Sequence, residues 1–299
     1  MKNRGYSVVM SIATPTFLRR LIDDAAIFPP GNAPLPVGVR EHLAIRRDGR
    51  SDVVGPFIVD VDRLQAAALL ARGMHSALDV SVVVREPSTV DQALRIVADQ
   101  DSLDLVGLEV VLSSTGDALE RDLEDLSDTI AALATPPAVW IELPWSISRD
   151  TWADDLAMVT NVGFALKIRT GGLTPQAFPS PQSLAEILCT AAELGLPFKC
   201  TAGLHSPVRH FDASTGAIHH GFLNLIIASV RARAGGSRSE VAAILGLEDA
   251  GILVQAMGMV PDDEMTSARE LFRSYGSCSI DEPLSELAQL GLISPGAGH

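Results

Sequence analysis

Cysteine is scarce in this sequence, which contains only Cys189, Cys200 and Cys278 in 299 residues. The number is odd, and no two cysteines have the CxxC spacing. This usage argues against a disulfide framework, which secreted proteins build from several paired cysteines. The apolar run near the N-terminus is too short for a signal peptide and is followed at once by charged residues. We therefore expect a reduced, cytoplasmic protein.

Positive charge and long apolar stretches are also in short supply. The 23 Lys and Arg residues are outnumbered by 37 Asp and Glu residues, which gives a formal net charge of −14. This balance argues against nucleic acids and anionic membrane surfaces as partners, and no apolar run is long enough to span a bilayer. We expect a small-molecule substrate, which can be anionic only where basic residues are concentrated. A homo-oligomer is compatible with the sequence.

Two nucleotide-binding motifs are absent as well. Neither a GxGxxG run after the first predicted strand nor a P-loop pattern occurs, which disfavours an open, doubly wound sheet. The chain instead alternates strand-like and helix-like segments, as α/β proteins do. The strand-like segments are rich in Val, Ile and Leu, which is typical of a parallel sheet covered on both faces. The six clearest predicted strands are residues 53–62, 77–85, 105–113, 138–145, 163–172 and 197–205.

Counting strands predicts a (β/α)8 TIM-like barrel that forms a single α/β domain over residues 1–299. Residues 220–236 are either a seventh strand running into a helix or helix throughout. Residues 251–261 look like an irregular or hairpin insertion before the last strand. Residues 267–279 contain the predicted eighth strand.

The first part of the chain is expected to lie outside the strand-and-helix repeat. Residues 16–28 have the pattern of a helix that begins after Thr14 and Pro15. Residues 1–50 are therefore predicted to be an N-terminal helical extension packed on the barrel. The role of Asp23 and Asp24, which precede a Phe-Pro-Pro-Gly loop, is left open between a lid and a rigid connection.

Polar side chains gather where the predicted strands end, which is where the catalytic groups of (β/α)8 barrels lie. Two of them, Glu109 and Glu142, are flanked by apolar residues, so each is expected to pair with a lysine or to serve in a site. The full set of strand-end residues is Asp60, Asp62, Arg85, Glu109, Glu142, Lys167, Arg169, Lys199, Thr201 and His205.

The strongest signal is a pair of lysines within apolar strands. Side chains alternate along a strand, so Lys167 shares a face with Arg169, and Lys199 shares a face with Thr201. Lysine is rarely buried unless it is paired. An amine with a second cation nearby and little water around it can attack a carbonyl carbon and form a Schiff base.

The runs KIRTGG from Lys167 and KCTAGL from Lys199 resemble the paired lysine motifs of class I, Schiff-base aldolases of the deoxyribose-phosphate aldolase type. In that family a strand ending in K-x-x-T-G carries the imine-forming lysine, and the next strand carries a second lysine before a glycine turn. The resemblance implies that Lys167 forms the imine and that Lys199 favours its uncharged form. It covers these two motifs alone. It departs from the family at Arg169, which has no counterpart, in the second turn, and in lacking a matched acid/base aspartate.

We therefore predict an enzyme that acts on a carbonyl compound, with aldolase-like carbon–carbon lyase chemistry favoured and no cofactor. The predicted catalytic residues are Lys167, Lys199, Glu142, Asp60 and His205. Two glycine turns are the expected sites for an anionic group of the substrate. The predicted substrate-binding residues are Arg169, Gly171, Gly172, Thr201, Gly276 and Ser277.

Two alternatives stay open. Four of the seven histidines, His205, His210, His219 and His220, lie within one short segment. A metal-dependent isomerase or hydrolase would hold a divalent metal with Glu109, Glu142 and His205.

The other alternative is a non-catalytic ligand-binding barrel. In that case Lys167–Glu142 and Lys199–Glu109 are buried ion pairs that serve structure alone.

Overall fold

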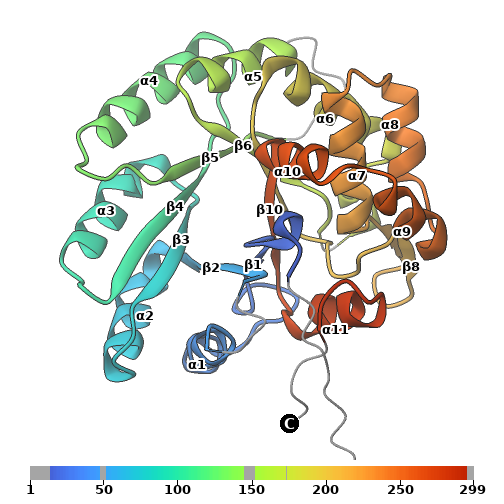
Figure 1. Cartoon of the computed structure of the whole chain (residues 1–299). Coiled ribbons are helices and arrows are strands. Elements are labelled where there is room, and N and C mark those ends of the chain that lie inside the picture. Colours follow the sequence, from blue (N-terminus) through green and yellow to red (C-terminus); the bar gives the residue numbers. More distant parts are fainter. Residues whose placement is uncertain (1–13, 48–51, 145–151, 173, 295–299) are drawn as a thin grey trace, which may run out of the picture.

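The computed structural model describes residues 14–47, 52–144, 152–172 and 174–294. Eight parallel strands form a closed barrel in the order β1-β10-β7-β6-β5-β4-β3-β2, and helices surround the strands (Figure 1). This confirms the predicted (β/α)8 fold. The barrel strands are β1 (Ile22–Asp24), β2 (Val54–Asp60), β3 (Leu78–Val84), β4 (Leu103–Val111), β5 (Ala138–Glu142), β6 (Ala165–Arg169), β7 (Phe198–Thr201) and β10 (Phe272–Ser277).

Most helices lie against the barrel strands, whereas α8 packs on α6 and α7, and α9 packs on α7. Short polar residues begin several of them: the Asp60 carboxylate accepts the backbone N–H of Arg63 at the start of α2, and Ser237 and Glu240 form a capping box at the start of α8. The helices are α1 (Leu35–Ile45), α2 (Val61–Gly73), α3 (Val90–Ala98), α4 (Asp117–Ala131), α5 (Trp152–Asn161), α6 (Pro181–Leu194), α7 (Phe222–Arg233), α8 (Arg238–Leu245), α9 (Ala250–Gly258), α10 (Asp262–Leu271) and α11 (Asp281–Gln289).

A two-stranded antiparallel hairpin, β8 (His210–Asp212) and β9 (Ala217–His219), stands apart from the barrel sheet. It lies in the long connection between β7 and α7, which leaves the carboxyl end of β7. The connections at this end of the strands are the ones that carry the active sites of (β/α)8 enzymes.

The predicted helix over residues 16–28 is wrong. The chain forms a short 3-10 helix at Thr16–Leu18 and then strand β1, which pairs with β10 and β2. Arg20 has φ +47°, which an α-helix does not allow. Of the predicted extension, residues 1–13 and 48–50 lie outside the described residues. Residues 14–47 contribute the first barrel strand as well as α1, and Asp23 and Asp24 are both buried strand residues.

The structure decides between the alternatives for one later segment and corrects the prediction for another. Residues 222–233 form helix α7 throughout, which is the second of the two alternatives for this segment, so the chain has no barrel strand there. Residues 250–258 form helix α9 and not an irregular or hairpin insertion. The predicted total of eight strands is right because β1 takes the place of the strand expected near Phe222.

Candidate active site

A layer of charged and polar side chains crosses the interior of the barrel, where aliphatic residues ordinarily pack. Each of its ionisable members is at most 9% exposed. Removing such groups from water costs several kcal/mol apiece unless they are paired. Seven strands contribute one side chain each: Asp23, Ser81, Glu109, Glu142, Lys167, Lys199 and Ser274.

Glu109 on β4 is the centre of this layer. Its Oε1 accepts hydrogen bonds from Lys199 Nζ at 2.7 Å and from Ser81 Oγ at 2.7 Å. Its Oε2 lies 2.9 Å from Lys167 Nζ. Burial alone would raise the pKa of this carboxyl, but the two ammonium groups outweigh it and hold the pKa of Glu109 well below its usual range. Glu109 is therefore an ionised carboxylate shared by both lysines.

Lys199 on β7 is fixed on its other side by Asp23. Its Nζ lies 2.5 Å from Asp23 Oδ2, which also accepts a hydrogen bond from Ser274 Oγ at 2.7 Å. Burial would lower the pKa of Lys199, but the attraction of Asp23 and Glu109 raises it above its ordinary value. Burial raises the pKa of Asp23 because it outweighs the attraction of Lys199. Lys199 is thus a fixed ammonium group held between two carboxyl groups.

Lys167 on β6 lies beside Lys199 in the sheet, since the two residues are register partners. Its Nζ is 2.9 Å from Glu109 Oε2 and 2.9 Å from Glu142 Oε2. The other oxygen of Glu142 is 3.3 Å from Arg169, whose side chain is 48% exposed at the carboxyl end of β6. Burial raises the pKa of Glu142, but Lys167 and then Arg169 lower it below its ordinary value. A continuous series of ion pairs therefore connects the buried Lys199 to the Arg169 guanidinium at the edge of the barrel.

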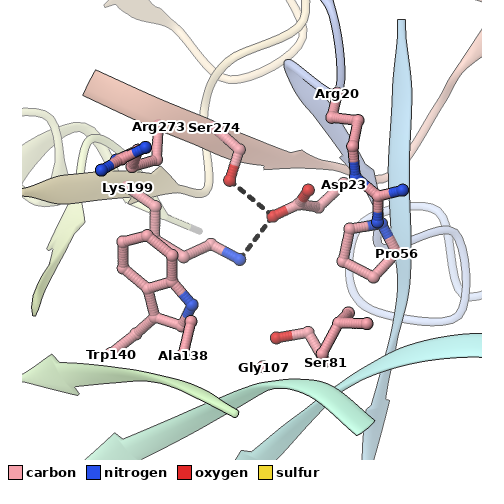
Figure 2. A pocket seen from close by; sticks show the side chains of 11 residues that line it. Arg20, Asp23, Pro56, Ser81, Gly107, Ala138, Trp140, Lys199, Arg273 and Ser274 are labelled. Carbon is pink, nitrogen blue, oxygen red and sulfur yellow. Dashed lines mark hydrogen bonds and ion pairs between the residues drawn. The ribbon is translucent and has the colours of Figure 1, made fainter. Parts of the chain in front are cut away.

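A cavity of about 210 Å³ enters the barrel from the opposite, amino-terminal end of the strands (Figure 2). Lys199 and Asp23 border it, together with Ser81 and Ser274. Trp140 also borders it, with Lys199 Nζ 5.6 Å from the centre of the indole ring. Its rim includes Arg20, Pro56, Ala138 and Arg273. The part of the charged layer that contains Lys199 and Asp23 therefore borders a small cavity, whereas Lys167 and Glu142 do not border it.

Asp60 and His205, the other predicted catalytic residues, have partners outside the charged layer. The Asp60 carboxylate pairs with Arg63 at the start of α2. His205 lies 3.8 Å from Cys278 Sγ through Nε2 and 3.5 Å from Glu282 through Nδ1. Burial lowers the pKa of His205 and raises that of Cys278, so this pair is an uncharged imidazole beside a thiol.

The glycine turns predicted to bind an anion are closely packed. A Cβ at Gly171 would lie 2.7 Å from the Phe178 ring and 2.8 Å from Gly203 Cα. A Cβ at Gly172 would lie 2.7 Å from Ala177.

The second turn predicted to bind an anion, at Gly276 and Ser277 at the end of β10, is also closely packed. Ser277 is buried and donates its hydroxyl hydrogen to the Ser279 carbonyl at 2.6 Å. A Cβ at Gly276 would lie 3.0 Å from Ile58 and 3.8 Å from the Thr201 hydroxyl. Packing thus accounts for these glycines. Arg169, in contrast, is a predicted substrate-binding residue with a half-exposed side chain.

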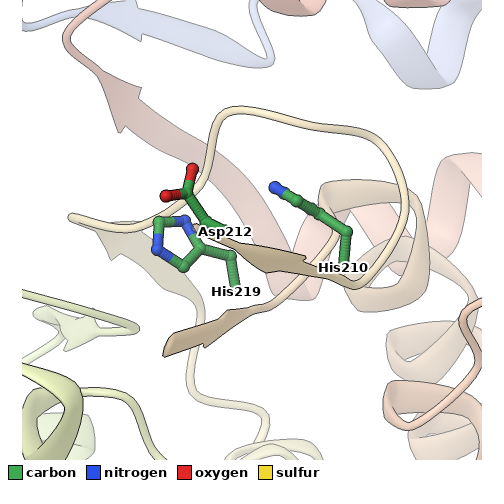
Figure 3. A group of neighbouring side chains, drawn as sticks. All are labelled: His210, Asp212 and His219. Atoms are coloured by element: carbon green, nitrogen blue, oxygen red, sulfur yellow. The ribbon is translucent and has the colours of Figure 1, made fainter. Parts of the chain in front are cut away.

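A second group of chemically active side chains lies on the hairpin β8–β9 (Figure 3). Ligand atoms of His210, Asp212 and His219 lie within 4.8 Å of one another. Among the described residues this is the set whose geometry suits a metal ion, and Glu109, Glu142 and His205 are not part of it. His220 points elsewhere and donates to the Pro179 carbonyl at 2.8 Å, with a pKa lowered by burial to about 4.

Sequence reasoning missed Asp23, Ser81 and Ser274 as members of the charged layer. Asp23 was hidden by the incorrect helix, and a serine within an apolar strand gives a weak signal. The hairpin did carry a usable signal: His-x-Asp, a short turn ending at Gly216, and a His two residues after Ala217. Alternation along two paired strands places these three polar residues on one face.

Comparison with models of known protein families finds no match, and comparison with curated proteins finds none either. In the part of the chain that the structure describes, no helix combines the length and the apolar character needed to cross a membrane.

Proposed function

We propose that this protein is a barrel enzyme that acts on a carbonyl compound, with Lys167 as an imine-forming amine and aldol-type carbon–carbon cleavage as the favoured reaction. The observation that carries the proposal is the sharing of one carboxylate, Glu109, by two lysines on adjacent strands. The likeness of the two lysine motifs to class I aldolases supports the same chemistry.

The two lysines are suited to different tasks. Lys199 is held by Asp23 and Glu109 with a raised pKa, so it remains positively charged and is a poor nucleophile. Lys167 has Glu142 as its second partner, and Glu142 leads to the half-exposed Arg169. Glu142 is positioned to accept the proton that Lys167 must lose before it attacks a carbonyl carbon.

The proposed reaction then uses groups that are already in contact. Lys167 Nζ gives a proton to Glu142 and attacks the carbonyl carbon, and the carbinolamine loses water to form the imine. Glu142 loses its proton to the departing water and can then take the proton of the substrate hydroxyl on the carbon beyond the imine. The carbon–carbon bond between these positions breaks, which releases one carbonyl product and leaves an enamine on Lys167. Glu142 returns the proton to the enamine carbon, and hydrolysis of the imine by water releases the second product and free Lys167. Arg169 would bind an anionic group of the substrate, as its exposure and cationic charge suggest.

The test uses formaldehyde with cyanoborohydride, because this probe reports whether a carbonyl carbon can reach the amine without knowledge of the natural substrate. The sequence contains three lysines, Lys2, Lys167 and Lys199. We expect reductive methylation of the folded protein, read by peptide mass mapping, at Lys167 and not at Lys199, which borders the cavity but is held as an ammonium group. Borohydride trapping with a panel of small 2-oxo acids and aldehydes would then place an adduct on Lys167.

The unfolded protein, in which all three lysines should be methylated, serves as the positive control for the probe. The matched variants are Lys167→Arg and Lys199→Arg, which keep the positive charge but cannot form a stable imine. Absence of label at Lys167 in the folded protein, while the unfolded protein is methylated there, contradicts the proposal. That result favours the non-catalytic alternative, for which both predicted ion pairs, Lys167–Glu142 and Lys199–Glu109, are the supporting observation.

A further inference from the structure

We infer that His210, Asp212 and His219 on the hairpin β8–β9 bind one divalent transition-metal ion. His210 and His219 are directly opposite each other in the antiparallel ladder, and Asp212 lies two residues from His210 on the same strand. All three side chains therefore project from one face of the hairpin, as Figure 3 shows. This site involves none of the residues of the charged layer, so it does not depend on the imine chemistry.

The hairpin has its polar face turned inward and its apolar face turned outward. His219 is 4% exposed and stacks on Phe178, with ring centres 4.4 Å apart. Phe211 and Ile218, which alternate with the three polar residues, are 63% and 41% exposed. A two-stranded ribbon ordinarily buries its apolar face. The reversal is explained if the buried face has a ligand to hold.

The hydrogen bonds around the imidazoles indicate which nitrogen of each ring is free. His210 Nδ1 lies 3.1 Å from the Val208 carbonyl, which can only accept, so Nδ1 carries the hydrogen and Nε2 keeps its lone pair. His219 Nε2 lies 2.8 Å from the Thr215 hydroxyl, which itself donates to Asp212. When His219 Nε2 is the donor in that contact, its Nδ1 keeps the lone pair, and this is the tautomer that a metal ion bound through Nδ1 selects.

The free nitrogen of His219 is a buried polar atom with no hydrogen-bond partner in the described part of the protein. Such atoms are uncommon and call for a reason, of which an ion is one. The Asp212 carboxylate has room for the same ion. Its hydrogen bonds from Ser214 and Thr215, within the described residues, end on Oδ1, which leaves Oδ2 available.

The surrounding contacts have the form found around protein metal sites. A metal-binding imidazole usually donates its other N–H to a carbonyl or a polar side chain, which fixes the ring. Val208 does this for His210, and Thr215 does it for His219. The three ligand atoms lie within 4.8 Å of one another, whereas ligand atoms around a bound ion are about 3–4 Å apart for metal–ligand bonds near 2.1 Å, so at most a small gap separates the two arrangements. Small rotations of the partly exposed Asp212 and His210 would close it.

Two imidazoles and one carboxylate select the class of metal. Mg²⁺ and Ca²⁺ take oxygen ligands, whereas imidazole suits Zn²⁺, Fe²⁺ and similar ions. Three protein ligands leave at least one coordination position for water or for an exchangeable ligand. In composition the site is therefore closer to a metal centre with a free coordination position than to a structural site with four protein ligands.

The test is a titration of the full, untagged chain after chelator treatment and dialysis, first with Co²⁺ followed by visible absorption and then with Zn²⁺ in competition. We expect one equivalent of Co²⁺ to bind and to be displaced by Zn²⁺. His210→Ala and His219→Ala should each weaken binding by about 100-fold or more. Thr215→Val, which removes the partner of one imidazole, should weaken it by about 10–100-fold.

His205→Ala is the control, because it removes a nearby histidine of the same connection whose direct contacts are with Cys278 and Glu282. His205 interacts with the three ligands only electrostatically, so His205→Ala should lose far less affinity for the metal than His210→Ala. Asp212→Asn provides a second ligand variant that preserves the shape of the turn, and circular dichroism establishes that each variant is folded.

Three outcomes overturn the inference. The first is that the unaltered chain binds neither Co²⁺ nor Zn²⁺ at millimolar concentration. The second is that folded His210, Asp212 and His219 variants keep full affinity, since the ion then sits elsewhere. The third is that His205→Ala loses as much affinity as His210→Ala.

Discussion

Lys167 and Lys199 are register partners on adjacent strands, and their amino groups bind the two different oxygens of one carboxylate. That carboxylate, Glu109, lies on β4, so three strands are joined through a single buried side chain. The arrangement keeps two like charges close together because an ionised group lies between them. It also couples the two lysines, so a change at one alters the electrostatic surroundings of the other.

The first prediction concerns the stability that Lys199 contributes. Lys199→Met should lower the free energy of unfolding by about 3–5 kcal/mol, because it leaves Asp23 and Glu109 as buried acids without their shared cation. Chemical unfolding followed by circular dichroism measures the change.

The control for Lys199→Met is Arg238→Met. Arg238 also bridges two carboxylates, those of Glu186 and Glu193, but its side chain is 49% exposed. An exposed pair of this kind contributes about 0–1 kcal/mol. Equal losses in the two variants would mean that burial of the Lys199 network has no special energetic consequence.

The second prediction concerns the acid limb of the stability curve. The pKa of Glu142 lies below its ordinary value of 4.5 in the native protein, so the unfolded chain binds a proton more readily. The stabilisation from Glu142 is therefore complete above about pH 4.5 and is lost as the pH falls through the native pKa. We expect Glu142→Gln to reduce the dependence of the urea midpoint on pH between about pH 5 and pH 3.

Glu109, whose pKa is lowered in the same way, keeps part of the dependence in that variant. The control is Glu120→Gln on the exposed face of α4, which should follow the unaltered protein. If Glu142→Gln retains the full slope, then the contacts of Glu142 with Lys167 and Arg169 do not set its ionisation.

Much of the barrel was predictable because its strands are apolar runs separated by helices with clear signals. The error at residues 16–28 has a physical cause. Ile22, Asp23 and Asp24 form only three residues of strand, and what makes them a strand is pairing with β10, over 250 positions away. A window of neighbouring residues cannot contain that pairing, so the local pattern favoured a helix.

The charged layer was predictable in part for the same reason. Lys167, Lys199, Glu109 and Glu142 stand out because a charge within an apolar strand is costly, and the ion pairs Lys167–Glu142 and Lys199–Glu109 are both present. The stagger of the strands around the closed barrel determines which carboxylate lies between the two lysines. That stagger is a property of the whole barrel and cannot be predicted from the sequence of a single segment.

The third prediction concerns Gly55 on β2, which leaves room for the carboxylate of Asp23 because glycine has no side chain. A Cβ at Gly55 would overlap with Oδ1 of Asp23. Gly55→Ala should therefore push this carboxylate away from Lys199 and lower the free energy of unfolding by about 1–3 kcal/mol, the usual cost of added volume in a packed interior. Thermal and urea unfolding measure the effect.

Gly73, the last residue of α2, is the matched control because a Cβ there would meet no atom within 4 Å. Gly73→Ala should leave stability unchanged or raise it by up to about 1 kcal/mol, since alanine restricts the unfolded chain more than glycine does. The comparison separates a steric effect at Asp23 from the general effect of replacing glycine. If Gly55→Ala proves as stable as Gly73→Ala, then Asp23 can move away from Lys199 with little loss of stability. The ion pair between Asp23 and Lys199 then does not determine where these two side chains lie.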